Sequence, residues 1–289
     1  MRVNNETKIS IITASFNDLE GLIETSNSIL QQTFPVEWII IDGDSGSEFR
    51  QFLTNLNSGP HIIKWVSEID LGLYDAMNKG FELSTGRILL FLNCGDTLAD
   101  DTIIRKILDS HNAENWNWGV GLAVRLNENG VPHTVWEYLK PQLSGLALGT
   151  RTFCHQAIFY TREILERVTP YDIHNLAADH LVNIKAFKIA QPKMLPIVTT
   201  YFRDGGISSQ RPFSAAMKDL RKIRIEENLL LGGFKVTDYI ISLIVVQSLR
   251  VSNLVWRINQ SLLQNTIFNK QQKRLPLVAK RQDRNVEKL

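Results

Sequence analysis

Four short apolar runs, separated by stretches of helical spacing, constrain the fold of this chain more than any other feature of its sequence. The runs cover residues 8–14, 37–41, 61–66 and 87–92. Between them, apolar side chains recur at helical spacing over about 19–30, 47–56 and 73–81. This alternation predicts an α/β fold, with a mostly parallel central sheet flanked by helices and joined by right-handed crossovers. Near-continuous apolar strands indicate that the sheet is buried on both faces.

The second half of the chain has a different pattern. Residues 115–159 break into short, aromatic-rich segments, which favour a mixed or antiparallel extension of the sheet. A helix over 179–189, a strand over 195–202 and a loop over 203–212 follow. The next helix covers 213–231 and ends at Gly232-Gly233, and a last helix runs from about 236 to 264. We therefore divide the chain into a catalytic domain (1–212), a helical extension (213–269) and a basic tail (270–289).

The composition is that of a protein with a large core and no overall charge bias. Of the 289 residues, 44% are hydrophobic and 21% are charged, and the formal net charge is +2. A net charge this small disfavours nucleic acid as a partner. Two cysteines give no disulfide framework, which favours a reducing compartment. The N-terminal residues lack the pattern of a signal peptide, and no apolar run reaches the roughly 18 residues of a membrane span, so we expect a cytoplasmic protein.

Polar and acidic residues follow each of the four predicted strands. In an open parallel sheet these positions meet at the carboxyl edge, where ligands bind. Carboxylates gathered there repel one another unless a cation or hydrogen-bond donors lie between them, and Mg²⁺ or Mn²⁺ prefers such oxygen ligands. Each residue also has a local alternative, since Asn17 and Asp96 could cap helices and Asp42 and Asp70 could shape turns. The residues that end the strands are Ser15, Asn17, Asp42, Asp70, Asn93 and Asp96.

Two common nucleotide-binding motifs are absent from the sequence. The first predicted strand is not followed by G-x-G-x-x-G, which disfavours a dinucleotide-dependent oxidoreductase. No G-x-x-x-x-G-K-[ST] loop occurs, which disfavours a phosphate-loop NTPase. A nucleotide at this edge must therefore be held by side chains and a divalent metal.

Several segments resemble the family 2 glycosyltransferases, which use the GT-A fold and a nucleotide-sugar donor and invert the anomeric centre. The likeness covers roughly residues 8 to 210 and is nearest to the colanic acid and related exopolysaccharide transferases. It implies a UDP- or GDP-sugar as donor, a divalent metal, and a glycan acceptor in bacterial surface or exopolysaccharide biosynthesis. The segments are ISIITASFND, WIIIDGDS, SEIDLGLYDAMNKG, LLFLNCGD, CHQAIFY, AADH and FRDGGISS.

The resemblance implies roles for residues at matching positions. The residues that it places around the nucleotide are Thr13, Ser15, Asn17, Asp42, Asp70, Asn78 and Lys79. It places His155 and Gln156 at the acceptor and sugar, and Arg203 and Ser208 in a loop over the diphosphate. The alternative for His155 and Gln156 is a structural role, and the alternative for the loop with Arg203 and Ser208 is an ordinary surface loop.

The same resemblance assigns the metal and the catalytic base. Asp96 lies at the family's metal position, but Asn93 stands where the pattern has another acid, so the metal loses one negative ligand. Asp179 matches the carboxylate that removes a proton from the acceptor hydroxyl, and a helix cap is its structural alternative. A nucleotidyltransferase is disfavoured, because no glycine-rich basic loop follows the first strand. Because Asn93 replaces an acid, an alternative function remains, in which the chain is a catalytically inactive GT-A-like nucleotide-binding or scaffold subunit.

The C-terminal end carries an amphipathic pattern and an excess of positive charge. Over residues 250–264 polar and apolar side chains separate onto two faces of a helix. The last twenty residues hold seven basic and two acidic side chains. Both features fit peripheral contact with an anionic membrane and a lipid-linked acceptor. Packing on the catalytic domain, or a dimer contact, is the alternative for the helix.

Overall fold

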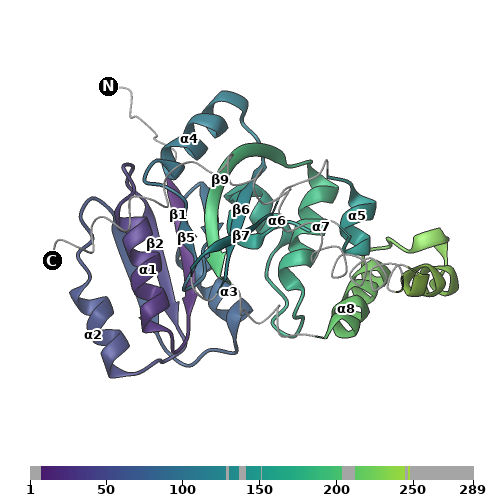
Figure 1. The fold of residues 1–289 in the computed structure, drawn as a ribbon, viewed down its shortest axis with the longest axis horizontal. Coiled ribbons are helices and arrows are strands. Elements are labelled where there is room, and N and C mark those ends of the chain that lie inside the picture. The colour runs from purple at the N-terminus through teal and green to yellow at the C-terminus, as the bar shows by residue number, and fades with distance from the viewer. Residues whose placement is uncertain are drawn as a thin grey trace. The chain divides into compact units, whose positions relative to one another are not determined.

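The computed structural model describes residues 8–127, 130–136, 141–150, 152–203, 212–244 and 247. Its N-terminal half is a parallel sheet in the strand order β3-β2-β1-β4 (Figure 1). The strands are β1 (Ile9–Ser15), β2 (Glu37–Asp42), β3 (Ile62–Ser67) and β4 (Ile88–Phe91). Ser15 is level with Asp42, and Asp42 with Ser67, so these strands deliver their carboxyl ends to one edge. The prediction of a parallel sheet with helical crossovers is confirmed.

The second half of the chain extends the sheet in mixed orientation. From β4 the order continues through β8, β6 and β9 to β5, while β7 pairs with β6. β8 runs antiparallel to both of its neighbours, β4 and β6, whereas β9 is parallel to β6. The additional strands are β5 (Thr97–Leu98), β6 (Trp118–Leu126), β7 (Pro132–Trp136), β8 (Ile158–Thr161) and β9 (Lys193–Arg203). The expected mixed extension is therefore also confirmed.

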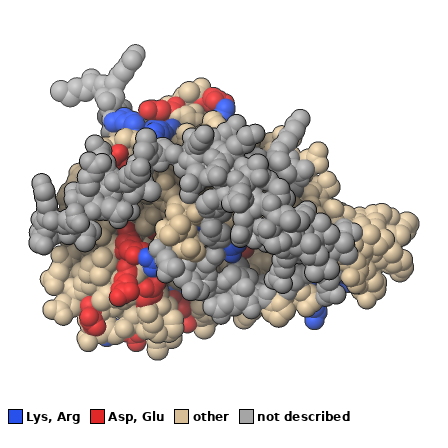
Figure 2. Space-filling model, viewed as in Figure 1, with Lys and Arg blue, Asp and Glu red and all other residues tan. Residues whose placement is uncertain are grey.

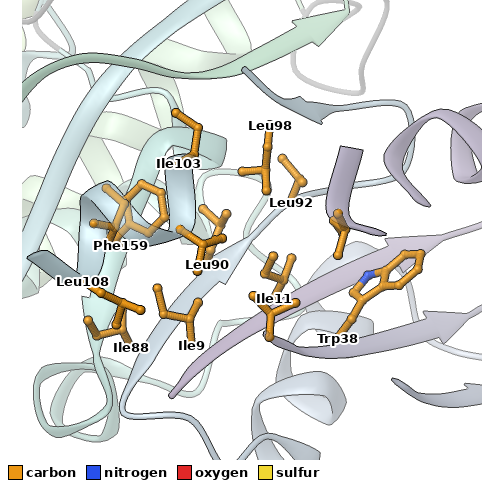
Figure 3. Close-up of a cluster of buried hydrophobic side chains, with 14 of the residues drawn as sticks. Ile9, Ile11, Trp38, Ile88, Leu90, Leu92, Leu98, Ile103, Leu108 and Phe159 are labelled. Carbon is orange, nitrogen blue, oxygen red and sulfur yellow. The ribbon is translucent and has the colours of Figure 1, made fainter. Parts of the chain in front are cut away.

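Helices cover both faces of the sheet. One face packs against α1 (Leu19–Leu30), α2 (Ser47–Asn55) and α4 (Ile103–Glu114) through a cluster that includes Ile11, Trp38 and Leu90 (Figure 3). The other face packs against α3 (Leu73–Leu83), α6 (Arg162–Val168) and α7 (Ala178–Ile189). The remaining described helices are α5 (Leu143–Leu148), η1 (His155–Ala157), α8 (Phe213–Glu226), η3 (Leu231–Gly233) and a helical segment over residues 235–244.

Two helix boundaries differ from those expected. Asp18 caps α1 by accepting from the Gly21 N–H at 2.8 Å, whereas Asn17, expected as the cap, has a left-handed backbone with φ of 52°. The helix expected over 213–231 ends at Glu226, because Asn228 takes a left-handed conformation with φ of 56°. Asparagine tolerates that conformation better than most residues, and its short side chain is the physical reason.

The chain divides into two compact units, Met1–Leu229 and Leu230–Leu289. α8 belongs to the first, where Arg224 donates to the Ala147 carbonyl at 2.9 Å, although the expected domain boundary lies before α8. Within the part of the chain that the structure describes, no helix is long and apolar enough to cross a bilayer. The amphipathic helix over 250–264 and the basic tail lie outside the described residues.

A buried carboxylate holds the amino ends of the four parallel strands together. Glu37, at the start of β2, is fully buried and accepts from Ser10 Oγ of β1 at 2.6 Å and from the Thr85 N–H at 2.7 Å. Lys64 of β3 and Lys8 bring their ammonium groups to within 2.9 and 3.1 Å of Glu37 Oε1. Burial raises the pKa of Glu37, but these donors outweigh it and hold the pKa well below the ordinary 4.5.

We predict that Glu37→Gln lowers the free energy of unfolding by about 2 kcal/mol at pH 7, because buried donors lose a charged acceptor. The Glu37 pKa is lower in the folded chain, so its contribution is present above about pH 4.5 and lost as pH falls. The gap between wild type and variant should therefore shrink between pH 7 and pH 3.5 in urea unfolding. Glu166→Gln, at an exposed position on α6, is the matched control. A gap independent of pH would contradict this account of Glu37.

Candidate functional site

A cavity of about 670 Å³ opens at the carboxyl edge of the parallel strands. Its walls come from the turns after β1, β2 and β3 and from the first turn of α3. The lining residues are Ala14, Ser15, Phe16, Gly43, Asp44, Ile69, Asp70, Gly72, Leu73 and Ala76. Figure 2 shows acidic side chains gathered where Figure 1 places α1 and α2. Of the seven residues expected around a nucleotide, Ser15 and Asp70 line this cavity.

The cavity has an aromatic wall and two carboxylates. Phe16 is 65% exposed, so most of its ring is available for contact. Asp70 Oδ1 accepts from the Gly72 N–H at 2.8 Å, which fixes the carboxylate in the turn after β3. Asp44, which the sequence analysis did not select, has a φ of 67° and forms an ion pair with Arg50. The sequence signal that could have found it is its place in the Asp-Gly-Asp-Ser turn directly after the strand.

Gly43 brings two walls of the cavity close together. A Cβ atom at this position would lie 3.0 Å from Phe16 Cδ2 and 3.1 Å from Asp70 Oδ2. Gly43 is not among the glycines with positive φ, so the space around it and not its backbone conformation requires a glycine. The width of the cavity between Phe16 and Asp70 thus depends on the absence of a side chain here.

Two of the other residues expected at the nucleotide are engaged inside the protein. Thr13 is fully buried, and its hydroxyl accepts from Trp38 Nε1 at 2.9 Å. Asp42 is also fully buried and accepts from Ser67 Oγ at 2.7 Å and from the Ser45 N–H at 3.0 Å. Both residues therefore fix the ends of strands, and contact with a nucleotide stays a prediction for them.

The remaining three residues of that set have other partners. The Asn17 N–H donates to Ser45 Oγ at 2.7 Å. Asn78 clamps a distant segment, because its amide donates to the Tyr171 carbonyl at 2.9 Å and accepts from the Tyr171 N–H at 2.8 Å. Lys79 lies 2.8 Å from Glu68 and 3.3 Å from Asp75, and the hydrogen bond with Glu68 is the main reason that its pKa is raised.

A second group of expected residues meets at the turn after β4. Asp96 is 7% exposed and accepts from the side chain of Gln156 and from the Arg203 N–H, the latter at 3.4 Å. Burial raises the pKa of Asp96 to about 7, against these donors. The Asn93 side-chain oxygen is buried and has no hydrogen-bond partner in the part of the chain that the structure describes. The guanidinium of Arg203 pairs with Glu24.

This turn has a defined geometry. The Asp96 N–H donates to the Asn93 carbonyl at 3.1 Å, and Gly95 between them has a φ of 88°, which favours glycine. Thr25 of α1 holds the turn, since its hydroxyl lies 2.8 Å from the Asp96 carbonyl oxygen and 3.0 Å from the Gly95 nitrogen. The Cys94 N–H donates to the Ala14 carbonyl at 3.2 Å, which joins the turn to the cavity wall.

Asp179 lies in the first turn of α7, and Tyr74 connects it to the cavity. The Tyr74 hydroxyl donates to Asp179 Oδ1 at 2.9 Å, and Tyr74 directly follows Leu73 of the cavity wall. Burial is the largest cause of the raised pKa of the Cys154 thiol, and the charges of Asp96 and Asp179 raise it further. Cys154 is therefore within electrostatic reach of both acids. The structure thus brings Asp179 toward the cavity wall and Asp96. The alternative role as a helix cap has no support, because no side chain caps α7.

His155 is a buried polar side chain beside these groups. It is 8% exposed, its ring stacks on Phe91 with centroids 5.4 Å apart, and neither ring nitrogen has a hydrogen-bond partner among the described residues. Burial lowers the His155 pKa, although Asp179 partly opposes this shift. A neutral imidazole with free nitrogens can bind a ligand hydroxyl or oxygen. Ser208 lies outside the described residues.

Comparison with known proteins identifies relatives of this chain. The family model of glycosyl transferase family 2 matches residues 10–169. An uncharacterised glycosyltransferase of Mycobacterium tuberculosis (strain H37Rv) is 30% identical over 225 residues, which are 74% of this chain and 82% of the relative. A PGL/p-HBAD biosynthesis glycosyltransferase of Mycobacterium bovis (strain BCG / Pasteur 1173P2) is 31% identical over 211 residues, covering 69% and 78%.

Solved structures share the fold. Residues 1–349 of S. aureus TarS, in complex with UDP-GlcNAc, match with a TM-score of 0.61 and 18% identity, over 76% of this chain. The match spans 66% of that structure, and a match to a longer TarS structure spans 39% of its chain. The likeness confirms the expected GT-A fold, with a mixed, curled sheet flanked by helices.

We predict that Asp96→Asn stabilises the protein as pH rises. The Asp96 pKa is about 7 in the folded chain and 3.8 ordinarily, so ionisation of Asp96 costs stability progressively from about pH 4 to pH 7. Asparagine is neutral throughout. The advantage of the variant over wild type should grow by about 2 kcal/mol between pH 5 and pH 8, measured by urea unfolding without ligand. Asp109→Asn, at an exposed position on α4, should show no such growth. An equal advantage at both pH values would contradict the prediction.

Proposed function

Because the chain belongs to glycosyl transferase family 2, we propose that it transfers a sugar from a UDP- or GDP-sugar to a glycan acceptor, with inversion of the anomeric carbon. The observation that carries this proposal is the cavity of about 670 Å³ at the carboxyl edge of the parallel strands, whose wall residue Leu73 directly precedes Tyr74, the partner of Asp179. A cavity of this size suits a ligand such as a nucleoside diphosphate.

The cavity would hold the nucleoside. The exposed ring of Phe16 offers an apolar surface for one face of the base. Asp70 and Asp44 can accept hydrogen bonds from a base N–H or from ribose hydroxyls, and Ser15 adds a hydroxyl at the end of β1. We assign the diphosphate to the side of the cavity at Ala14, since the hydrogen bond from the Cys94 N–H to the Ala14 carbonyl leads there to the Asp96 turn.

The residues at the turn after β4 fit a divalent cation. The buried, unpartnered Asn93 oxygen and the Asp96 carboxylate are hard oxygen donors of the kind that Mg²⁺ and Mn²⁺ prefer. Among the described residues no group of three metal-binding acids, histidines or cysteines occurs, and Mg²⁺ sites completed by substrate phosphates do not need one. When bound, the cation would neutralise charge on the departing nucleoside diphosphate.

Asp179 is our candidate for the base. An acceptor hydroxyl that attacks the anomeric carbon must lose its proton, and a carboxylate can take it in a single displacement. The Tyr74 hydrogen bond holds one oxygen of Asp179, Oδ1, and leaves Oδ2 for the acceptor. His155 and Gln156 lie beside this carboxylate and beside Asp96, where they can contact the sugar or the acceptor.

Arg203 and Ser208 are proposed to act on the diphosphate from the loop after β9. The Arg203 guanidinium pairs with Glu24 in this structure, so contact with a diphosphate would replace that ion pair. Both partners are about 40% exposed, and exchange of such a pair costs little free energy.

We further propose that the acceptor is a lipid-linked glycan of the bacterial surface, reached from the cytoplasmic face of the membrane. The likeness to exopolysaccharide transferases and the basic C-terminal tail support this proposal. One relative is itself named for PGL/p-HBAD biosynthesis.

The proposal predicts the release of nucleoside diphosphate from one or more members of a panel of UDP- and GDP-sugars, with Mg²⁺ or Mn²⁺ present. Water can stand for the acceptor hydroxyl in this assay, so slow hydrolysis suffices. Asp179→Asn should reduce the release at least 100-fold, the lower range for loss of a general base, while calorimetry shows an unchanged affinity for the nucleotide.

Asp172→Asn is the matched control, because this exposed acid lies in the segment before α7 and only accepts from the His174 N–H. It should retain the wild-type rate. Undiminished release by Asp179→Asn would remove this carboxylate from the reaction. Absence of both release and nucleotide binding in the wild type, across the panel, would overturn the proposed function.

We predict that Gly43→Ala weakens binding of UDP or GDP about tenfold, equivalent to about 1.4 kcal/mol. The new methyl group would push Phe16 and Asp70 out of their positions in the cavity wall. Calorimetric titration measures the affinity, and the thermal midpoint, measured alongside, shows whether the variant is folded. Unaltered affinity would place the nucleotide elsewhere.

A further inference from the structure

One helix of the second unit has its polar and apolar faces reversed relative to an ordinary surface helix. Its residues 235–244 are described as helical. Its polar residues Asp238 and Ser242 are buried, at 0% and 7% exposure. Six large apolar side chains of the segment are between 46% and 73% exposed, and they are Phe234, Val236, Tyr239, Ile240, Leu243 and Ile244. A surface helix normally buries such a stripe.

Local hydrogen bonds hold the helix in this orientation. Asp238 Oδ1 accepts from the Leu231 N–H at 3.2 Å, and the Thr237 hydroxyl lies 2.9 Å from the Leu231 carbonyl oxygen. The Ser242 hydroxyl donates to the Asp238 carbonyl at 2.6 Å. Because the preceding 3₁₀ turn occupies the polar face, the apolar face is the one left exposed.

We propose that this apolar face, residues Phe234–Ile244, docks into the interfacial region of an anionic lipid bilayer. Within the described residues no helix is long and apolar enough to cross a bilayer, so we place this face in the plane of the membrane interface. Tyr239 is a residue type that favours the level of the lipid headgroups, and Phe234 is typical of the apolar face that such segments insert.

The charges of the C-terminal region favour a bilayer over a second copy of the chain. In Phe234–Ile244 the exposed charge is Lys235, whereas the acid Asp238 is buried on the opposite face. The last twenty residues add seven basic and two acidic side chains. Positive charges attract anionic headgroups by about 1 kcal/mol each near the surface, and they would repel the same tail on a second copy. Apolar insertion and basic attraction together give stable membrane attachment.

The proposal concerns the second unit and does not depend on the transfer reaction. We would test it by sedimentation of the full chain with phosphatidylcholine vesicles that contain about one third phosphatidylglycerol. Ile240→Ser with Ile244→Ser should lower the fraction bound at least tenfold. Ile62→Ser with Leu83→Ser is the matched control, since these apolar residues are similarly exposed on the first unit. It should bind vesicles like the wild type.

Three results would overturn the proposal. One is wild-type protein that stays in solution with these vesicles, and another is equal binding by the Ile240/Ile244 variant, which would leave the basic tail as the whole cause. The third is a dimer in solution that this variant converts to monomer while vesicle binding is absent, which would make the face a contact between copies. The thermal midpoint is measured alongside, and an unchanged midpoint shows that the variant is folded.

Discussion

The carboxylate of Glu37 is the interaction on which the arrangement of the parallel strands depends. It receives donors from β1, from β3 and from Thr85 in the segment before β4, so one buried group connects the amino ends of four strands. With those ends fixed, the pairing of Ser15, Asp42 and Ser67 is fixed at the opposite edge. The cavity is formed by the turns that leave this edge, and its shape therefore depends on a contact at the other end of the strands.

Glu37 and Asp96 are both buried acids, yet their surroundings give them opposite properties. Glu37 is surrounded by hydroxyl, amide and ammonium donors, and its pKa is low. Asp96 has the Gln156 side chain and a long contact from the Arg203 N–H, which do not offset burial, and its pKa rises to about 7. A carboxylate that the fold leaves incompletely satisfied retains capacity for an external partner. The unpartnered oxygen of Asn93 in the same turn has the same property.

The sequence predicted the parallel sheet and the edge that bears the cavity, because both follow from local periodicity and from the geometry of parallel strands. It also selected Asp96, Gln156 and Arg203, which the fold brings into contact. It could not show that Asn78 binds the backbone of Tyr171, 93 residues away, because such a pairing leaves no local pattern. Tyr74 was missed for the same reason, since its partner Asp179 is 105 residues away. The short helices α5 and α6 have too few turns for a readable period.

The first turn of α3 serves two regions of the protein at once. Leu73 faces the cavity, and the next residue, Tyr74, holds Asp179. These neighbours share one peptide unit, so a displacement of the turn moves both. Mutational tuning of nucleotide affinity at this turn would therefore also change the position of the carboxylate, and the two properties cannot be optimised there one at a time.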